Sequence, residues 1–175
     1  MIKHLVEVSV QNASAQHFYD FMINPTTQRY QAWWPGEHLD FHIVKPGDDN
    51  HLGDVVFMDE YLGGEGRRLT FHAVVARVIR PNQIVWQMKK AGLRLPAFVT
   101  LDLSDTPDGI VVKHELCIGF RGIGAILDPF IRLYFNKPFR HALETHCKIE
   151  WPMLAEYLRR GDSMSPDTNL QSKQM

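Results

Sequence analysis

Six candidate strands separated by turn-forming residues fill the middle of the chain, and this pattern restricts the possible folds more than any other feature of the sequence. The separators are short and rich in Gly, Pro, Asn and Asp, as in Ala91-Gly92 and Asp108-Gly109. Glycine supplies the positive φ values that tight hairpin turns need. Strands joined by such turns pair with their sequence neighbours, so the pattern predicts an antiparallel meander. The predicted strands are His38–Lys45, Asp54–Leu62, Arg67–Ile79, Gln83–Lys90, Leu93–Leu103 and Gly109–Phe120.

The residues before the meander predict one more strand and two short helices. Residues Ile2–Val10 alternate between apolar and polar side chains, which is typical of a half-buried strand. A first helix follows and ends at Asn24-Pro25, because the residue before a proline disfavours the helical region. A second helix runs from about Thr26 to Trp33. These elements add a seventh strand and a helix pair to the meander.

The residues after the meander, from about Ala125 to Arg160, predict a long helix with an apolar stripe. Pro138 and Pro152 lie inside this segment, and each removes a helix hydrogen bond, so we expect a kink or an interruption. Residues 161–175 contain few apolar side chains and are expected to be disordered, which leaves one domain over residues 1–160. The stripe consists of Phe135, Phe139, Leu143, Cys147, Leu154 and Leu158.

The separation of strands from helices along the chain is typical of α+β architecture. A curved sheet of seven strands would leave one face bare, and only the long amphipathic helix is able to cover it. We therefore predict a curved, seven-stranded antiparallel sheet wrapped around the C-terminal helix, with two short helices after the first strand.

Composition and charge exclude several classes of protein. The net charge is −1 at pH 7 with both signs interspersed, whereas a nucleic-acid-binding face needs clustered basic residues. The longest apolar runs are far shorter than the ~20 residues of a membrane-spanning helix. Cys117 and Cys147 lie in unrelated segments, so neither a disulfide scaffold nor a zinc ribbon is expected. The first residues alternate and carry charge, unlike a signal peptide, and we expect a cytoplasmic protein.

Three segments resemble the START-like (SRPBCC) superfamily, which includes polyketide cyclases, pollen allergens and Aha-type activator domains. They are Ala15–Phe21 with the following Asn24-Pro25, then Trp33-Trp34-Pro35, and finally Glu150–Leu158. The similarity in element order covers residues 1–160. The resemblance implies the helix-grip fold, with an apolar ligand held between the sheet and the C-terminal helix. Because this superfamily contains ligand carriers, enzymes and chaperone activators, the resemblance does not determine the function.

Two of the predicted strands supply candidate cavity residues. Val112, His114 and Leu116 share the apolar face of residues 110–118, because side chains two apart along a strand point the same way. His114 is therefore predicted to point between sheet and helix, where it orients a ligand, acts as a general acid or base, or packs in the core. Trp86 shares its face with apolar neighbours, which suits either a wall for a flat ligand or ordinary core packing.

Other residues are candidates for accompanying His114. The strand that contains His72 is apolar on both faces, so this residue either contacts a ligand or packs, according to a register that the sequence leaves open. Tyr61, Tyr134 and His141 are candidate polar partners of His114, although the sequence does not show that they converge. The predicted ligand-binding residues are Trp86, Val112, His114, Leu116, His72, Tyr61, Tyr134 and His141.

No metal site and no cofactor are predicted. His146 and Glu150 are four residues apart and share a helix face, but the sequence has no HExxH motif and no third converging ligand. We expect a solvated polar face there. His38, Asp40 and His42 alternate along one strand, and three polar groups on one face predict the solvent side.

The tryptophan pair at the end of the second predicted helix has two interpretations. Trp33 and Trp34 either line the entrance of a pocket or anchor the helix pair on the sheet, and we expect the anchoring role.

Three functional hypotheses remain open. The first, which the sequence favours, is binding of an apolar small molecule such as a lipid, an isoprenoid, a polyketide or another aromatic compound. The second is an enzyme of the cyclase or dehydratase type that uses His114 or His72 on a bound substrate. The third is an Aha-like protein that activates a partner, although no protein partner is evident from the sequence.

Overall fold

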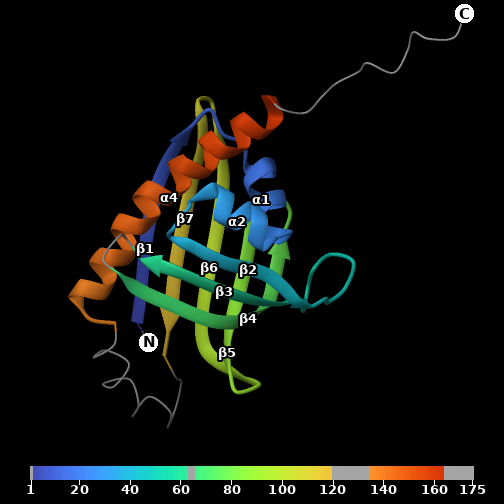
Figure 1. The fold of residues 1–175 in the computed structure, drawn as a ribbon, viewed down its shortest axis with the longest axis vertical. Coiled ribbons are helices and arrows are strands. Elements are labelled where there is room, and N and C mark those ends of the chain that lie inside the picture. Colours follow the sequence, from blue (N-terminus) through green and yellow to red (C-terminus); the bar gives the residue numbers. More distant parts are fainter. Residues whose placement is uncertain (1, 63–65, 120–134, 164–175) are drawn as a thin grey trace, which may run out of the picture.

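The computed structural model describes residues 2–62, 66–119 and 135–163. Its seven strands form one sheet in the order β1-β7-β6-β5-β4-β3-β2, and all neighbouring pairs are antiparallel (Figure 1). The predicted α+β class and the antiparallel meander are thereby confirmed. The strands are β1 (Ile2–Gln11), β2 (His38–Lys45), β3 (Val55–Leu62), β4 (Arg67–Ile79), β5 (Gln83–Lys90), β6 (Leu93–Thr106) and β7 (Gly109–Ile118).

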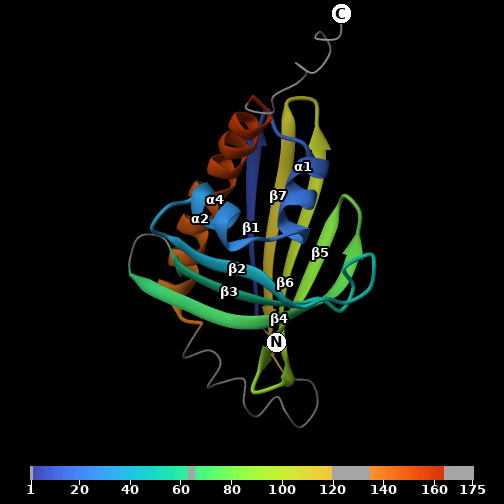
Figure 2. The same cartoon turned by 45° about the vertical axis from the view of Figure 1, so that its right-hand side comes forward.

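The helices α1 (Ala15–Ile23), α2 (Thr27–Trp33) and α4 (Lys137–Ser163) lie on the same side of the sheet (Figure 1). Figure 2 shows the sheet bending, so that β2, β3 and β4 run crosswise to β1 and β7. Asn24 ends α1 ahead of its proline as predicted, and the side chain of Thr26 caps α2 by accepting a hydrogen bond from the backbone N–H of Arg29. Among the described residues, no helix is long and apolar enough to cross a membrane.

The long helix is continuous across both of its prolines. Of the two predicted alternatives, a kink or an interruption, the interruption is therefore wrong. Pro138 is the second residue of α4, where a backbone N–H has no partner within the helix and its loss costs nothing. Pro152 lies in the helix interior, and its ring is exposed. The helix begins at Lys137 and continues past the predicted end at Arg160 to Ser163. The predicted helical start near Ala125 and most of the predicted disordered tail lie outside the described residues.

The core lies between the sheet and the predicted apolar stripe of α4. Phe139, Leu143, Cys147 and Leu154 are buried against residues that the strands direct inward, such as Leu101. Burial of these side chains holds the helix on the sheet, since each fully buried apolar side chain contributes roughly 1.5–3 kcal/mol.

Candidate functional site

A cavity of about 510 Å³ lies between α4 and the sheet. This volume falls within the range of small-molecule sites, which is roughly 300–1,000 Å³. Its wall is mostly apolar and combines side chains from the central strands with side chains from the first half of α4. Representative lining residues are Trp86, Met88, Leu101, Leu116, Phe139 and Leu143.

Three of the predicted ligand-binding residues line this cavity, namely Trp86, His114 and Leu116. The alternation along β7 predicted the inward direction of His114, and the structure confirms that direction. Val112 points the same way but is fully buried in the core and does not reach the cavity. Its role is packing.

Three other predicted residues lie away from the cavity. Phe71 and Glu60 line the cavity, so their strand neighbours His72 and Tyr61 point to the opposite face of the sheet. His72 is exposed and packs against the ring of Phe57 on that outer face. His141 is an exposed residue of α4. Tyr134 lies outside the described residues.

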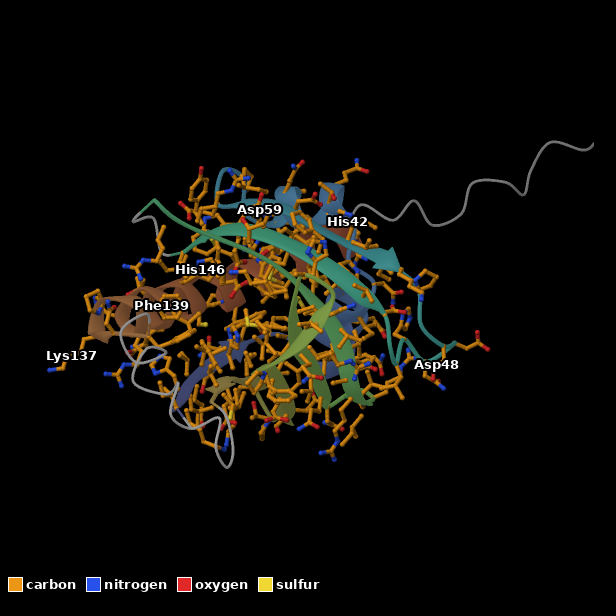
Figure 3. The ribbon with its side chains drawn as sticks, turned by 90° about the horizontal axis from the view of Figure 1, so that it is seen from below. His42, Asp48, Asp59, Lys137, Phe139 and His146 are labelled. Carbon is orange, nitrogen blue, oxygen red and sulfur yellow. The ribbon has the colours of Figure 1, made fainter. Side chains whose placement is uncertain are left out.

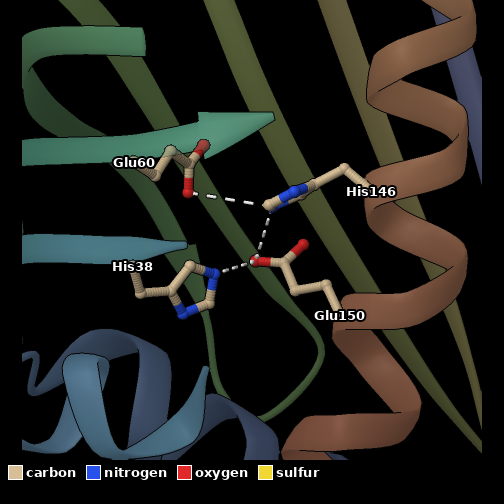
Figure 4. A group of neighbouring side chains, drawn as sticks. All are labelled: His38, Glu60, His146 and Glu150. Atoms are coloured by element: carbon tan, nitrogen blue, oxygen red, sulfur yellow. Dashed lines mark ion pairs between the residues drawn. The ribbon is translucent and has the colours of Figure 1, made fainter. Parts of the chain in front are cut away.

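One end of the cavity is polar. Glu60, His146 and Glu150 contribute to the lining, and His38 lies directly beside them (Figure 4). We call these four residues the buried cluster, because each is at most 7% exposed. In Figure 3 His146 lies between helix and sheet, whereas Lys137 projects outward from the start of α4.

The members of the buried cluster approach one another closely. His38 Nε2 lies 3.6 Å from Glu150 Oε1, and His146 Nε2 lies 3.7 Å from the same oxygen. His146 Nε2 is also 3.9 Å from Glu60 Oε2. The cluster therefore connects two strands to the helix (Figure 4).

His38 reaches the cluster because of a bulge in β2. It is paired with Glu60, but the next pair is Asp40 with Asp59, so the register shifts after one extra residue in β2. The prediction that His38, Asp40 and His42 share the solvent side is thus wrong for His38, which is 1% exposed. Asp40 and His42 do lie together on the partly exposed face, with 2.7 Å between Asp40 Oδ1 and His42 Nδ1.

His146 and Glu150 were expected on a solvated face, and this prediction is also wrong. Each lies three residues after an apolar member of the buried stripe, Leu143 and Cys147 respectively, and so faces the sheet. Glu60 was not predicted, yet it continues the inward-facing alternation that includes Val56. The sequence contained a signal for all three residues. His146 and Glu150 are polar residues within the apolar stripe of the helix, and Glu60 is a polar residue within the apolar alternation of its strand.

The charges of the cluster determine its protonation. Burial alone lowers the pKa of His146, but the Glu150 carboxylate, followed by Glu60, raises it to about 9. Burial disfavours the charged form of Glu150, yet His146 and His38 hold its pKa well below the usual range. Burial raises the pKa of Glu60. At neutral pH the cluster therefore contains a protonated His146 beside an ionised Glu150.

Aromatic residues surround the cluster. The hydroxyl of Tyr30 donates a hydrogen bond to Glu60, and its ring stacks on His38 with 3.9 Å between the centroids. Trp34 stacks on His146 at 4.8 Å. The indole N–H of Trp33 donates to the backbone carbonyl of Glu150 at 3.2 Å. The tryptophan pair therefore anchors α2 on α4 as well as on β2.

His114 lies beside the buried cluster. Its Nδ1 is 3.0 Å from Cys147 Sγ, and its ring meets Trp151 edge to face at 5.9 Å. Burial lowers the pKa of His114 to about 4, so the imidazole is neutral at pH 7. Burial also raises the pKa of the Cys147 thiol, which keeps it protonated. Neither group carries charge into the cavity at neutral pH.

Solved structures with very different sequences share this architecture. Protein NE0264 from Nitrosomonas europaea superposes with a TM-score of 0.57 at 12% identity, over 93% of this chain and 97% of that chain. Protein SA2116 from Staphylococcus aureus gives 0.54 at 8% identity, over 93% and 96%. Ginseng major latex-like protein 151 from Panax ginseng gives 0.54 at 9% identity, over 81% and 97%. The chain has the helix-grip fold.

Comparison of the sequence with protein families and curated proteins identifies no relative. No protein-family model matches the chain, and no curated protein matches its sequence. Likeness at such low identity shows the fold alone, so the chemistry must be inferred from the side chains.

The cavity combines a mostly apolar wall with a group of charged and hydrogen-bonding side chains. Imidazole and carboxylate groups in a site protected from water are able to hold a polar ligand atom, transfer a proton or bind a cation. Glu60, His114, His146 and Glu150 are the imidazole and carboxylate groups that line the cavity and could do so.

Proposed function

We propose that the protein binds an apolar small molecule whose single polar end is directed at the buried cluster. The observation that carries this proposal is that Glu60, His146 and Glu150 lie together in the lining of a mostly apolar cavity of about 510 Å³. Specific small-molecule sites combine predominantly apolar walls with a few placed polar groups that fix orientation.

The chemistry of the cluster defines the ligand class. Protonated His146 donates hydrogen bonds, which favours a ligand with a carbonyl, hydroxyl or carboxylate oxygen at one end. Trp86 and the methionines Met58 and Met88 supply flat and adaptable contact area for the rest of the ligand. Lipids, isoprenoids, polyketides and other aromatic compounds with one polar end meet these requirements.

The proposal is tested with Leu116→Trp, which places extra volume in the cavity. An apolar fluorescent probe should bind the wild type, and the variant should bind it at least about tenfold more weakly, a difference of 1.4 kcal/mol. Leu5→Trp is the matched control, because Leu5 lies on the neighbouring strand β1 and is 52% exposed. If both variants keep their melting temperature and bind the probe like the wild type, the cavity is not the binding site.

A second candidate function is catalysis on the bound molecule. The specific observation is that His114 and the buried cluster bring several titratable groups to one cavity, as an acid–base enzyme requires. His72 is on the outer face and drops out of this hypothesis. For a substrate found by screening, His114→Gln should retain binding and lose turnover by roughly 10²–10⁴-fold. A carrier would show no turnover in either protein.

We further propose that the protein acts in the cytoplasm and does not bind nucleic acid. The net charge of −1, with acidic and basic residues interspersed, supports the absence of nucleic-acid binding. Cell fractionation with an antibody against the full chain tests the location.

A further inference from the structure

We propose that the buried cluster of His38, Glu60, His146 and Glu150 binds a divalent transition-metal ion such as Zn²⁺. The sequence argued against a metal site because the helix supplies only two ligands. The structure brings the third and fourth donors from β2 and β3 to the same point (Figure 4).

The spacing of the donor atoms suits such an ion. With metal–ligand bonds of about 2.0–2.1 Å, two ligands of a tetrahedral ion lie roughly 3.4 Å apart. The measured separations between imidazole nitrogens and carboxylate oxygens are 3.6, 3.7 and 3.9 Å. One donor atom from each of the four residues lies within 4.8 Å of the other three. Small side-chain rotations would bring all four to bonding distance of a common centre.

The environment of His38 is an independent argument for a metal ion. Both of its ring nitrogens are buried and have no hydrogen-bond partner, and the residue is 1% exposed. Its Nε2 points at Glu150 but stays beyond hydrogen-bond distance. Buried polar groups are nearly always hydrogen-bonded, so a buried imidazole without a hydrogen bond, beside two carboxylates and a second imidazole, supports a bound metal ion at this point.

The donor set selects the class of ion. Two imidazole nitrogens with two carboxylate oxygens suit Zn²⁺ and similar first-row divalent ions, whereas Ca²⁺ and Mg²⁺ prefer sites made of oxygen alone. Two ionised glutamates would also neutralise the charge of a divalent ion at a site whose four donor residues are all buried. Tyr30 hydrogen-bonds to Glu60 and would orient that carboxylate as an outer partner.

The ion would be accessible from the cavity. Glu60, His146 and Glu150 line it, while His38 lies behind them. Zn²⁺ would displace the proton of His146, so the metal-bound protein would present the ion to a ligand in place of a protonated imidazole. Zn²⁺ alone is the probe in the following test, so its outcome does not depend on whether the cavity also binds a small molecule.

The full chain, stripped with a chelator and dialysed, is titrated with Zn²⁺ by calorimetry in competition with a chelator of known affinity. We expect one Zn²⁺ per chain, a higher melting temperature with Zn²⁺, and visible absorption bands of four-coordinate Co²⁺ when Co²⁺ replaces it. Failure of the wild type to bind Zn²⁺ at micromolar concentration would overturn the proposal without any variant.

Two pairs of variants locate the ion. His38→Gln and His146→Gln should each weaken Zn²⁺ binding by at least about tenfold and abolish the Co²⁺ bands. His42→Gln on the same strand and His141→Gln on the same helix are the matched controls and should bind like the wild type. Equal loss in a variant and its control indicates surface histidines and overturns the proposal.

The neighbouring group of His114, Cys147 and Glu150 is the competing location. If His114→Gln weakens binding and His38→Gln does not, the ion lies there and the proposal is wrong. Should His146→Gln fail to fold, His38→Gln together with the wild-type titration decides the outcome.

Discussion

His38 and Glu60 are paired across the β2–β3 ladder, and both side chains point beneath α4. From the helix, Glu150 Oε1 approaches His38 Nε2 to 3.6 Å, and His146 Nε2 approaches Glu60 Oε2 to 3.9 Å. Strand pair and helix are thus connected by charged groups as well as by apolar packing. We therefore expect the buried cluster to contribute to the stability of the fold.

Replacing Glu150 by Gln should destabilise the protein by about 3–5 kcal/mol, because removing one partner of a buried ion pair leaves the other charge uncompensated. His146 is that partner, and its Nε2 lies 3.7 Å from Glu150 Oε1. Urea unfolding at pH 7 measures the loss. Glu144→Gln is the matched control on the same helix, since Glu144 pairs with Lys148 at the surface and should change the free energy of unfolding little. Equal losses would contradict the buried ion pair.

Tyr30→Phe should cost about 1–3 kcal/mol of stability, because it removes the hydroxyl that donates to the buried Glu60 carboxylate and leaves that oxygen with one partner fewer. The ring and its stacking on His38 are retained. Thermal melts of this variant are compared with those of Tyr61→Phe, which changes a partly exposed tyrosine on the outer face of the same sheet. A loss in Tyr61→Phe as large as that in Tyr30→Phe would exclude a specific role for the buried bond.

The fold could be predicted because its periodic patterns are nearly unbroken. Alternation along the strands and the apolar stripe of α4 gave the correct layers, and alternation along β7 gave the direction of His114. His38 could not be placed in the same way, since one extra residue in β2 reverses the side chains beyond it. A bulge depends on how two strands pair, and neither strand shows it alone.

The cluster was missed for a second physical reason. Polar residues were assigned to solvent, but His146 and Glu150 occupy the buried stripe because they satisfy one another's charge. Burial of such residues is favourable only when the partners converge in three dimensions. The sequence shows at most that His146 and Glu150 share one helix face. His38 and Glu60 come from strands that are far away in the chain, so their convergence is not visible in the sequence.

Pro152→Ala should stabilise the protein by about 1–3 kcal/mol, because Pro152 lies inside α4 and lacks the N–H that would donate to the carbonyl of Lys148. The proline is exposed, so alanine leaves no cavity. Pro138→Ala is the matched control, since Pro138 lies in the first turn and has no such bond to restore. Differential scanning calorimetry should show a higher melting temperature for Pro152→Ala and an unchanged one for Pro138→Ala. A lower melting temperature for Pro152→Ala would contradict the prediction and would mean that the packing of α4 requires the proline.

His114 should make the protein less stable in acid. Burial lowers the pKa of this imidazole from the model-peptide value of 6.5 to about 4, with Glu150, His146 and His4 as the nearby charged or titratable groups. Between these two pH values the unfolded chain binds the proton and the folded chain does not. Stability should therefore fall as the pH drops from 6.5 toward 4, and His114 should account for up to about 3 kcal/mol of the loss.

Above pH 6.5 His114 is neutral in both states and contributes no pH dependence. His114→Gln and His114→Phe remove the titrating group, so their unfolding free energies should change less than that of the wild type between pH 7 and pH 4. Urea unfolding at half-unit pH intervals gives the three curves. Each variant is compared with its own value at pH 7, which separates loss of the proton site from loss of packing against Cys147 and Trp151. Parallel curves for all three proteins would show that His114 keeps an ordinary pKa and is open to water in the folded state.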